Sequence, residues 1–431
     1  MTDNLTQITL SNGLRVLLKE IHTAPLISSW TWYRVGARDE VKGLTGISHW
    51  VEHMQFKGTP QFPANLLEKA IARDGGVWNA FTHLDWTTYF ETMPADRIDL
   101  ALRLEADRMV NSIYDLEEVA SERTVIISER EGNENEPHFL LGEAVQGAAF
   151  RVHAYHHEVI GEMADLQAIT RDDLFSHYKT YYVPNNAVLA IAGDFDTDEM
   201  LVRIKELYEP ISKGEDPNRI GQPEPPQEGE IRLSVEGPGE TTYVQVCYHF
   251  PPATHPDFYP LSVLNSLFAG PSGLNMFGGG NSNKTSRLYR AMVDKEWVVG
   301  VRGSAQATID PFLYTVAFTI HPDRQADEAL SVLDDEIKRV QDEIISEDEV
   351  RRAIKQARAL FAYGSENISN QAFWMGYSEM FADYTWFENY LDNLSAVTPA
   401  SVQRVAREYL RPESRVVGTY VPKDTREVQD A

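Results

Sequence analysis

Residues 43–58 read GLTGISHWVEHMQFKG, and two histidines and a glutamate fall within five consecutive positions of this segment. Apolar residues recur through it at helical spacing, which predicts an amphipathic helix. These residues are Leu44, Ile47, Val51 and Met54. Gly58 follows the last of them and is a plausible end of the helix, since glycine is favoured just beyond helix C-termini.

The two histidines of this segment are four residues apart, so His49 and His53 project from one helix face, one turn apart. Two neutral imidazole nitrogens at that spacing can bind one Zn²⁺. Glu52 can lie beside such a metal without binding it and accept a proton from metal-bound water. The order H-x-x-E-H is the inverzincin motif. The alternative is two surface histidines and a solvated glutamate on an amphipathic helix.

A catalytic zinc takes three protein ligands and keeps one position open, so a third ligand is needed. A second predicted helix, 115–131, places Glu118, Glu122 and Glu129 on one face. Carboxylates on a partly buried helix need a partner, and a metal or a ligand histidine would serve. A solvated acidic helix face is the alternative, so the residues alone leave the third ligand open.

Composition excludes several classes of protein. The chain has 431 residues, of which 42% are hydrophobic and 24% charged, as in a soluble globular protein with two to four domains. Its net charge of −26 argues against nucleic acid or an anionic membrane as partner. The single cysteine, Cys247, rules out an internal disulfide framework.

The N-terminal residues show neither a basic nor an apolar signal region, and no apolar run is long enough to span a membrane. We therefore expect a cytoplasmic protein. A periplasmic protein whose signal peptide had been removed would look the same, so that alternative stays open.

The remaining patterns predict alternating strands and helices. We expect a hairpin over 8–18 that turns at Asn12-Gly13, because Asn-Gly is a preferred hairpin turn. The other expected elements are strands over 26–35, 77–93 and 187–193, and helices over 65–73, 94–111 and 169–182.

Four pairs of residues share one offset of 228 positions, which indicates an internal duplication. The pairs are Pro94 and Pro322, Thr170 and Thr398, Tyr181 and Tyr409, and Pro184 and Pro412. We expect an α+β fold with two tandem copies of one α/β unit, 1–209 and 231–431. The proline-rich segment 210–230 would be the exposed linker that lets the halves face each other across a cleft.

The chain resembles the pitrilysin/insulinase zinc metallopeptidases, and especially their mitochondrial-processing-peptidase-like branch. The resemblance includes the histidine motif and Glu129, which follows His53 by 76 residues. Residues 122–129, ERTVIISE, resemble a second characteristic block of that family. Residues 76–82, GVWNAFT, with Asp85 and Tyr89, resemble its substrate-side strand.

This resemblance implies a role for each matching residue. His49, His53 and Glu129 would bind one Zn²⁺ per chain. Glu52 would be the general base, and Glu122 would orient a ligand histidine. The two copies would form half of a clamshell.

The resemblance also implies how substrate binds. The strand that contains Asn79, Ala80 and Phe81 would receive an extended peptide as an added strand. The expected activity is that of a zinc metalloendopeptidase acting on peptides or unfolded polypeptides.

One departure concerns the Arg and Tyr, seven residues apart, with which active relatives bind substrate in the C-terminal half. The matching positions hold Val293 and Gly300, which cannot donate a side-chain hydrogen bond. We therefore expect a heterodimer in which a homologous sister subunit supplies the pair. The alternative is a non-catalytic scaffold or core subunit of a larger complex.

A histidine cluster lies at His153, His156 and His157. A second metal site is one interpretation. The neighbouring Tyr155 and the approach to Gly161 favour an ordered loop instead.

Overall fold

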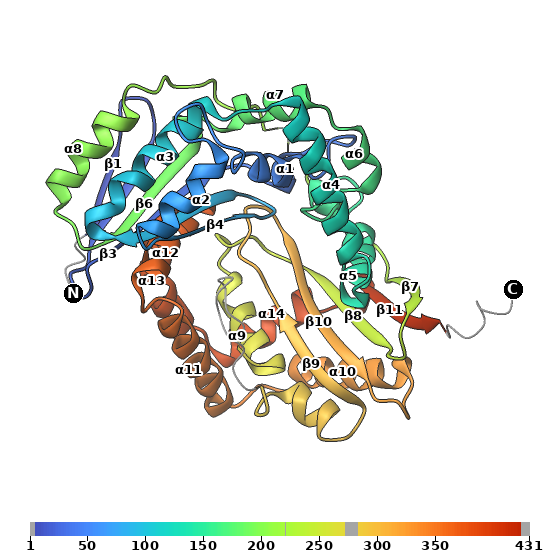
Figure 1. The fold of residues 1–431 in the computed structure, drawn as a ribbon. Coiled ribbons are helices and arrows are strands. Elements are labelled where there is room, and N and C mark those ends of the chain that lie inside the picture. The colour runs from blue at the N-terminus through green and yellow to red at the C-terminus, as the bar shows by residue number, and fades with distance from the viewer. Residues whose placement is uncertain (1–4, 220, 272–282, 424–431) are drawn as a thin grey trace, which may run out of the picture. The chain divides into compact units, whose positions relative to one another are not determined.

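The computed structural model describes residues 5–219, 221–271 and 283–423. It divides into two compact units: unit 1 comprises Met1–Arg130, His157–Gln222 and Ser365–Phe387, and unit 2 the remainder. Each unit is a mixed sheet packed with helices (Figure 1). The predicted α+β class with two copies of one unit is confirmed.

Unit 1 contains a six-stranded sheet in the order β1-β2-β6-β3-β5-β4. The strands are β1 (Leu5–Thr9), β2 (Arg15–Glu20), β3 (Leu26–Tyr33), β4 (Val77–Thr82), β5 (Thr87–Pro94) and β6 (Ala187–Gly193). Strands β2 and β6 are parallel, and the other neighbours are antiparallel. The predicted hairpin is β1–β2, and Gly13 in its turn has a positive φ of 92°.

Unit 2 contains a five-stranded sheet in the order β7-β11-β8-β10-β9. The strands are β7 (Ile231–Pro238), β8 (Tyr243–Phe250), β9 (Val298–Ser304), β10 (Phe312–Ile320) and β11 (Arg415–Lys423). Only β7 and β11 are parallel neighbours in this described sheet. The order and directions repeat those of β2-β6-β3-β5-β4, so the second sheet copies the first without β1.

Helices follow the same repeat. Those of the first half are α1 (Ile47–Met54), α2 (Ala64–Arg73), α3 (Ile98–Asn111), α4 (Leu116–Asn133), α5 (Pro137–Ala149), α6 (Met163–Ala168), α7 (Arg171–Tyr181) and α8 (Thr197–Tyr208). Those of the second are α9 (Phe258–Ala269), α10 (Ala326–Asp342), α11 (Glu347–Tyr363), α12 (Ile368–Phe381), α13 (Tyr384–Ser395) and α14 (Pro399–Tyr409). In the described ranges, none combines the length and apolar character that crossing a bilayer requires.

Equivalent caps begin α7 and α14. The side-chain oxygen of Thr170 accepts the backbone N–H of Asp173, and that of Thr398 accepts the N–H of Ser401. The two threonines are 228 residues apart, so the offset seen in the sequence corresponds to the same local structure in both copies.

The histidine helix α1 is shorter than predicted. It begins at Ile47, because Gly46 has a left-handed φ of 84°, and Leu44 therefore precedes the helix. It ends at Met54, four residues before Gly58. Both histidines and Glu52 nevertheless lie within it.

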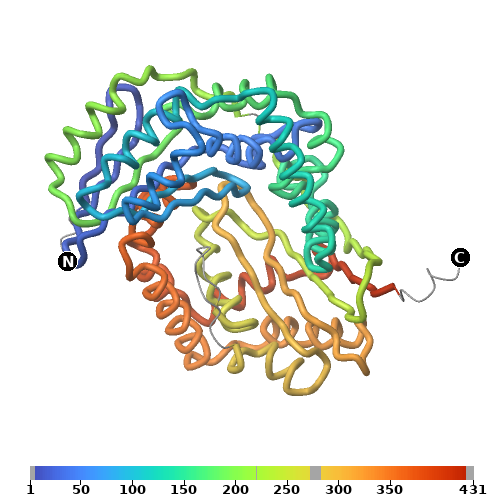
Figure 2. Tube along the Cα trace, in the orientation of Figure 1, coloured from blue at the N-terminus to red at the C-terminus, as the bar shows by residue number. Residues whose placement is uncertain are grey.

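The two halves of the chain exchange helices. Helix α5, from the first half, packs on β7, β8 and β11, whereas α12, from the second half, packs on β2, β3 and β6. These two sets of strands are equivalent in the repeat, and Figure 2 shows the trace from α4 into α5 and from α11 into α12. Each compact unit therefore contains segments from both halves of the chain. The division into 1–209, a linker 210–230 and 231–431 describes the two copies in the sequence and stays a prediction.

The linker 210–230 is largely exposed but is bound to its surroundings. In unit 1, Arg219 forms an ion pair of 3.2 Å with Asp39. In unit 2, the Glu224 carboxylate accepts the backbone N–H groups of residues 151–153 at 2.9–3.0 Å.

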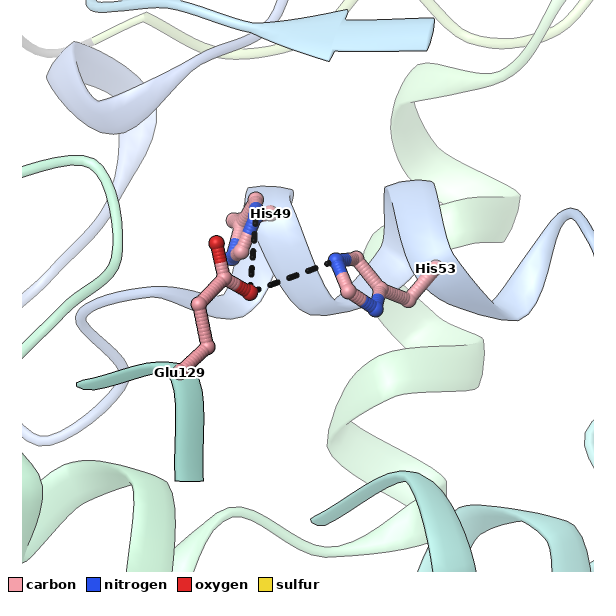
Figure 3. A group of neighbouring side chains, drawn as sticks. All are labelled: His49, His53 and Glu129. Carbon is pink, nitrogen blue, oxygen red and sulfur yellow. Dashed lines mark ion pairs between the residues drawn. The ribbon is translucent and has the colours of Figure 1, made fainter. Parts of the chain in front are cut away.

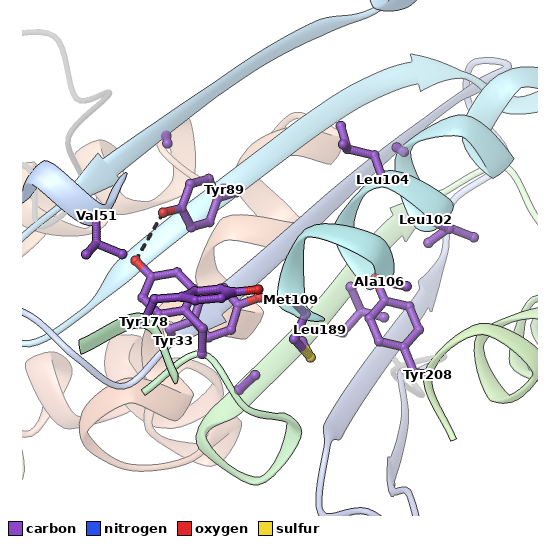
Figure 4. Packing of buried hydrophobic residues seen from close by; sticks show 14 of the residues in the cluster. Tyr33, Val51, Tyr89, Leu102, Leu104, Ala106, Met109, Tyr178, Leu189 and Tyr208 are labelled. Carbon is purple, nitrogen blue, oxygen red and sulfur yellow. Dashed lines mark hydrogen bonds between the residues drawn. The ribbon is translucent and has the colours of Figure 1, made fainter. Parts of the chain in front are cut away.

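Each face of the unit 1 sheet has its own core. On one face, Tyr33, Leu189 and Met109 belong to a buried cluster, part of which is drawn in Figure 4. Trp30 and Trp32 alternate with Tyr33 along β3, so they point to the opposite face, where both contact Phe373 of α12. The exchanged helix thus completes the second core.

We predict that Gly376 is essential for this packing. A Cβ at Gly376 would overlap the indole of Trp32, which is fully buried. Gly376→Ala should therefore lower the free energy of unfolding by about 1–3 kcal/mol, as overpacked cores do. Urea denaturation measures this change.

Gly142 on α5 supplies the matched control. The nearest atom to its added Cβ is Gln245 Oε1 at 4.0 Å, so Gly142→Ala should be neutral or stabilising by up to about 1 kcal/mol. Equal effects of the two substitutions would contradict the close approach of α12 to β3.

Candidate metal centre

Three side chains from two helices of unit 1 converge in space. His49 and His53 project from α1, and Glu129 reaches them from α4 (Figure 3). Glu129 Oε2 lies 3.9 Å from His49 Nε2 and 3.8 Å from His53 Nε2. The structure thus brings the three predicted ligands together, and no second group of this kind occurs among the described residues.

The spacing of these atoms fits a zinc ion. Separations of 3.8–3.9 Å are too long for hydrogen bonds. Ligand atoms of a tetrahedral zinc lie about 3.4 Å apart, because each bond is near 2.0–2.1 Å. His49 Nδ1, the ring nitrogen that does not face Glu129 Oε2, is buried and makes no hydrogen bond in the described part of the chain. Two imidazoles and a carboxylate are also a common donor set for catalytic zinc.

The environment of His49 favours the form that binds a metal. Burial, aided by the neighbouring His53, lowers the pKa of His49 to about 3. The imidazole is therefore neutral at physiological pH and keeps a nitrogen lone pair.

Glu122 orients the second histidine. Its Oε1 lies 2.8 Å from His53 Nδ1, and because a carboxylate only accepts, Nδ1–H donates and Nε2 keeps its lone pair. Burial raises the pKa of Glu122, but the bonds from His53 and Lys57 outweigh it, so the net pKa is lowered. For His53, burial lowers the pKa, but Glu122 and other nearby carboxylates make the net shift upward.

Lys57, which the sequence interpretation missed, forms an ion pair with Glu122. It follows His53 by four residues, a spacing that could have suggested a shared face. The helix itself, however, ends at Met54.

Glu52 is buried beside the three converging atoms and is not one of them. Its Oε2 accepts a 2.6 Å hydrogen bond from the Thr82 hydroxyl at the end of β4, and its Oε1 has no such bond within the described residues. Burial raises the pKa of Glu52 to about 7. Thr82 was also missed as a partner, because a contact across 30 residues leaves no periodic signal in the sequence.

The predicted substrate strand is β4, at one edge of the unit 1 sheet. Asn79 is exposed, Ala80 is buried and Phe81 is half-buried. One side of β4 pairs with β5, and no described strand pairs with the other. Its free edge can therefore accept an extended peptide.

At the two positions that the resemblance matches to the Arg and Tyr, Val293 is half-buried and Gly300 lies in β9. A Cβ added at Gly300 would meet no atom of the described residues within 4 Å.

The histidine cluster does not converge on a common point. His153 Nε2 lies 3.2 Å from Asp310, whereas His157 Nε2 lies 3.6 Å from Glu40. His156 Nδ1 instead lies 3.3 Å from the His153 carbonyl oxygen. These contacts fit an ordered loop.

Comparison with known proteins places the chain in a family. Residues 15–162 match the model described as insulinase (peptidase family M16), and residues 168–357 match the one described as peptidase M16 inactive domain. An uncharacterised zinc protease of Streptomyces coelicolor is 27% identical over 98% of this chain and 91% of its own length. A probable mitochondrial-processing peptidase subunit beta of Arabidopsis thaliana is 25% identical over 96% of this chain and 78% of its own length.

A solved structure agrees with these sequence matches. A protease from Helicobacter pylori superposes with a TM-score of 0.90 and 25% identity, over 97% of this chain and all of that one. Family models match both halves, relatives align over nearly the full length, and the fold is shared. The chain therefore belongs to the insulinase family of peptidases, family M16.

Proposed function

We propose that this chain is the zinc-bearing subunit of a metalloendopeptidase that hydrolyses extended peptides or unfolded polypeptides. The observation that carries the proposal is the convergence of His49 Nε2, His53 Nε2 and Glu129 Oε2 beside the buried Glu52. The names of the relatives, zinc protease and processing peptidase, support it.

His49, His53 and Glu129 would hold the Zn²⁺, which when bound supplies a Lewis acid that polarises the scissile carbonyl and acidifies water. Glu52 accepts a proton from the attacking water through its free Oε1 and passes that proton to the leaving amine. Thr82 fixes the other oxygen, so the carboxylate keeps one orientation. The edge of β4 binds the substrate backbone through residues such as Asn79 and Phe81.

We further propose that a homologous sister subunit completes the substrate site, because Val293 and Gly300 carry no hydrogen-bonding side chain. The Arabidopsis relative is itself named as a subunit. A non-catalytic scaffold subunit is the rival function, but it would not need a general base beside two histidines and a carboxylate that converge.

We predict about one zinc per purified chain, lost in His49→Ala because one of three ligands is removed. Glu52→Gln should keep the zinc but lower peptide hydrolysis, assayed with the sister subunit, at least about 100-fold, since the proton acceptor is gone. Elemental analysis and a fluorogenic peptide assay measure the two quantities. Wild-type turnover by Glu52→Gln would show that Glu52 is not the general base. A chain unable to bind zinc would support the rival function, a non-catalytic scaffold subunit.

Thr82→Val should lower kcat by about tenfold to a hundredfold, because a hydrogen bond to the reacting carboxylate is lost. Thr82→Ser keeps the hydroxyl and serves as the control. Zinc content should be unchanged in both variants. If Thr82→Val has the kcat of the wild type, the hydroxyl does not orient Glu52.

The need for a sister subunit can be tested by introducing the Arg and Tyr at positions 293 and 300 of this chain. The double variant Val293→Arg, Gly300→Tyr should cleave peptide faster than the unmodified chain when each is assayed alone, because it restores the two hydrogen-bonding side chains and a Cβ at Gly300 meets no described atom within 4 Å. In the control, Val299→Tyr replaces Gly300→Tyr and points the ring to the opposite face of β9. Full activity of the unmodified chain alone would refute the requirement for a partner.

A further inference from the structure

A buried carboxylate binds the start of the histidine helix. Glu40 Oε2 accepts the backbone N–H of Gly46 at 2.7 Å, and Oε1 accepts that of Ser48 at 2.8 Å. The N-cap residue of α1 is Gly46, which has no side chain to cap the helix. Glu40, six residues earlier in the chain, takes over that role.

The site of Glu40 is an unfavourable one for a charge unless it is paired. The side chain is fully buried, and this burial raises the pKa of Glu40 to about 8. The two backbone N–H groups act in the opposite direction, because they and the positive end of the helix favour the ionised form. The imidazole ring of His157 also faces this carboxyl group, with its Nε2 3.6 Å from Glu40 Oε2.

A second contact holds the turn that leads into α1. Asp165 Oδ2 accepts the backbone N–H of Gly43 at 3.1 Å and both the N–H and the hydroxyl of Thr45, at 3.0 and 2.7 Å. Gly46 also packs directly against Gly161, and a Cβ on either glycine would overlap the backbone of the other segment. The turn has little freedom to shift.

The position of this turn decides where the histidines point. An isolated helix of eight residues is not stable in water, so packing and end contacts set its position. His49 directly follows Ser48, whose N–H is one of the two held by Glu40. A rotation of α1 about its axis would turn both imidazoles away from Glu129.

We propose that Glu40 is a positioning residue for the metal centre, which fixes the first turn of α1 through Gly46 and Ser48 so that His49 and His53 face Glu129. This inference rests on the proposed function, in which those three residues bind zinc. Glu40 itself does not touch the metal or the substrate; it acts through the helix backbone.

The test compares Glu40→Gln with a matched control. Glutamine has the shape of glutamate but turns an NH₂ group toward one of the two backbone donors, so one bond is lost. Glu20→Gln makes the same substitution at the start of α8, where Glu20 Oε1 accepts the N–H of Thr197 at 2.7 Å and the glutamine oxygen can keep that bond. Helix α8 carries none of the residues assigned to the metal centre.

Three measurements distinguish positioning from general stability. Zinc affinity is measured by competition with a chromophoric chelator, the ligand geometry by the visible absorption of added Co²⁺, and helix protection by hydrogen exchange of residues 46–54 in the zinc-free chain. In Glu40→Gln we expect zinc binding about 10- to 100-fold weaker, an altered Co²⁺ spectrum and faster exchange. In Glu20→Gln all three should match the wild type.

The conservative variant Glu40→Asp keeps the carboxyl group but is one methylene shorter, and its zinc affinity should lie between those of wild type and Glu40→Gln. It also serves as the test if Glu40→Gln does not fold. Wild-type zinc affinity and wild-type exchange in the folded Glu40 variants would overturn the inference. A wild-type chain that binds no zinc would instead refute the proposed function, and the exchange of 46–54 would still decide whether Glu40 holds the helix.

Discussion

The side-chain contacts between α1 and α4 are the interaction on which the proposed metal centre depends. A helix of eight residues has little stability of its own, so its neighbours must hold it. Arg123 of α4 lies over the Trp50 ring of α1 at 4.8 Å, and Glu122 of α4 binds His53. The helix that supplies Glu129 is therefore fastened to the helix that supplies the histidines at two points.

Four carboxyl groups of unit 1 differ in role because their surroundings differ. Glu129 is the accessible one, with a side chain that is 44% exposed. Glu122 is held between Lys57 and His53 and so fixes a ring. Glu52 is buried with one free oxygen, as a proton acceptor requires, whereas Glu40 has both oxygens bound to backbone N–H groups. Under the proposed function, the same chemical group would serve as ligand, orienting partner, base and helix anchor.

The exchange of α5 and α12 shows how a duplicated chain can build two interdependent cores. Each exchanged helix meets its sheet where a glycine allows close approach. Gly376 lies on the helix side, against Trp32, and Gly418 lies on the sheet side, against Val145 of α5. Each half of the chain therefore completes the core of the unit formed mainly by the other half.

Local spacing along the chain was enough to predict several features. These were the shared face of His49 and His53, the strand at 187–193 and the repeat at an offset of 228. By contrast, three features became evident only from the packed elements: which glutamate of α4 faces the histidines, that Thr82 and Glu40 contact α1, and that α5 and α12 change partners. Helical and strand periodicity is written into neighbouring residues, whereas contacts between distant residues arise only when the elements pack.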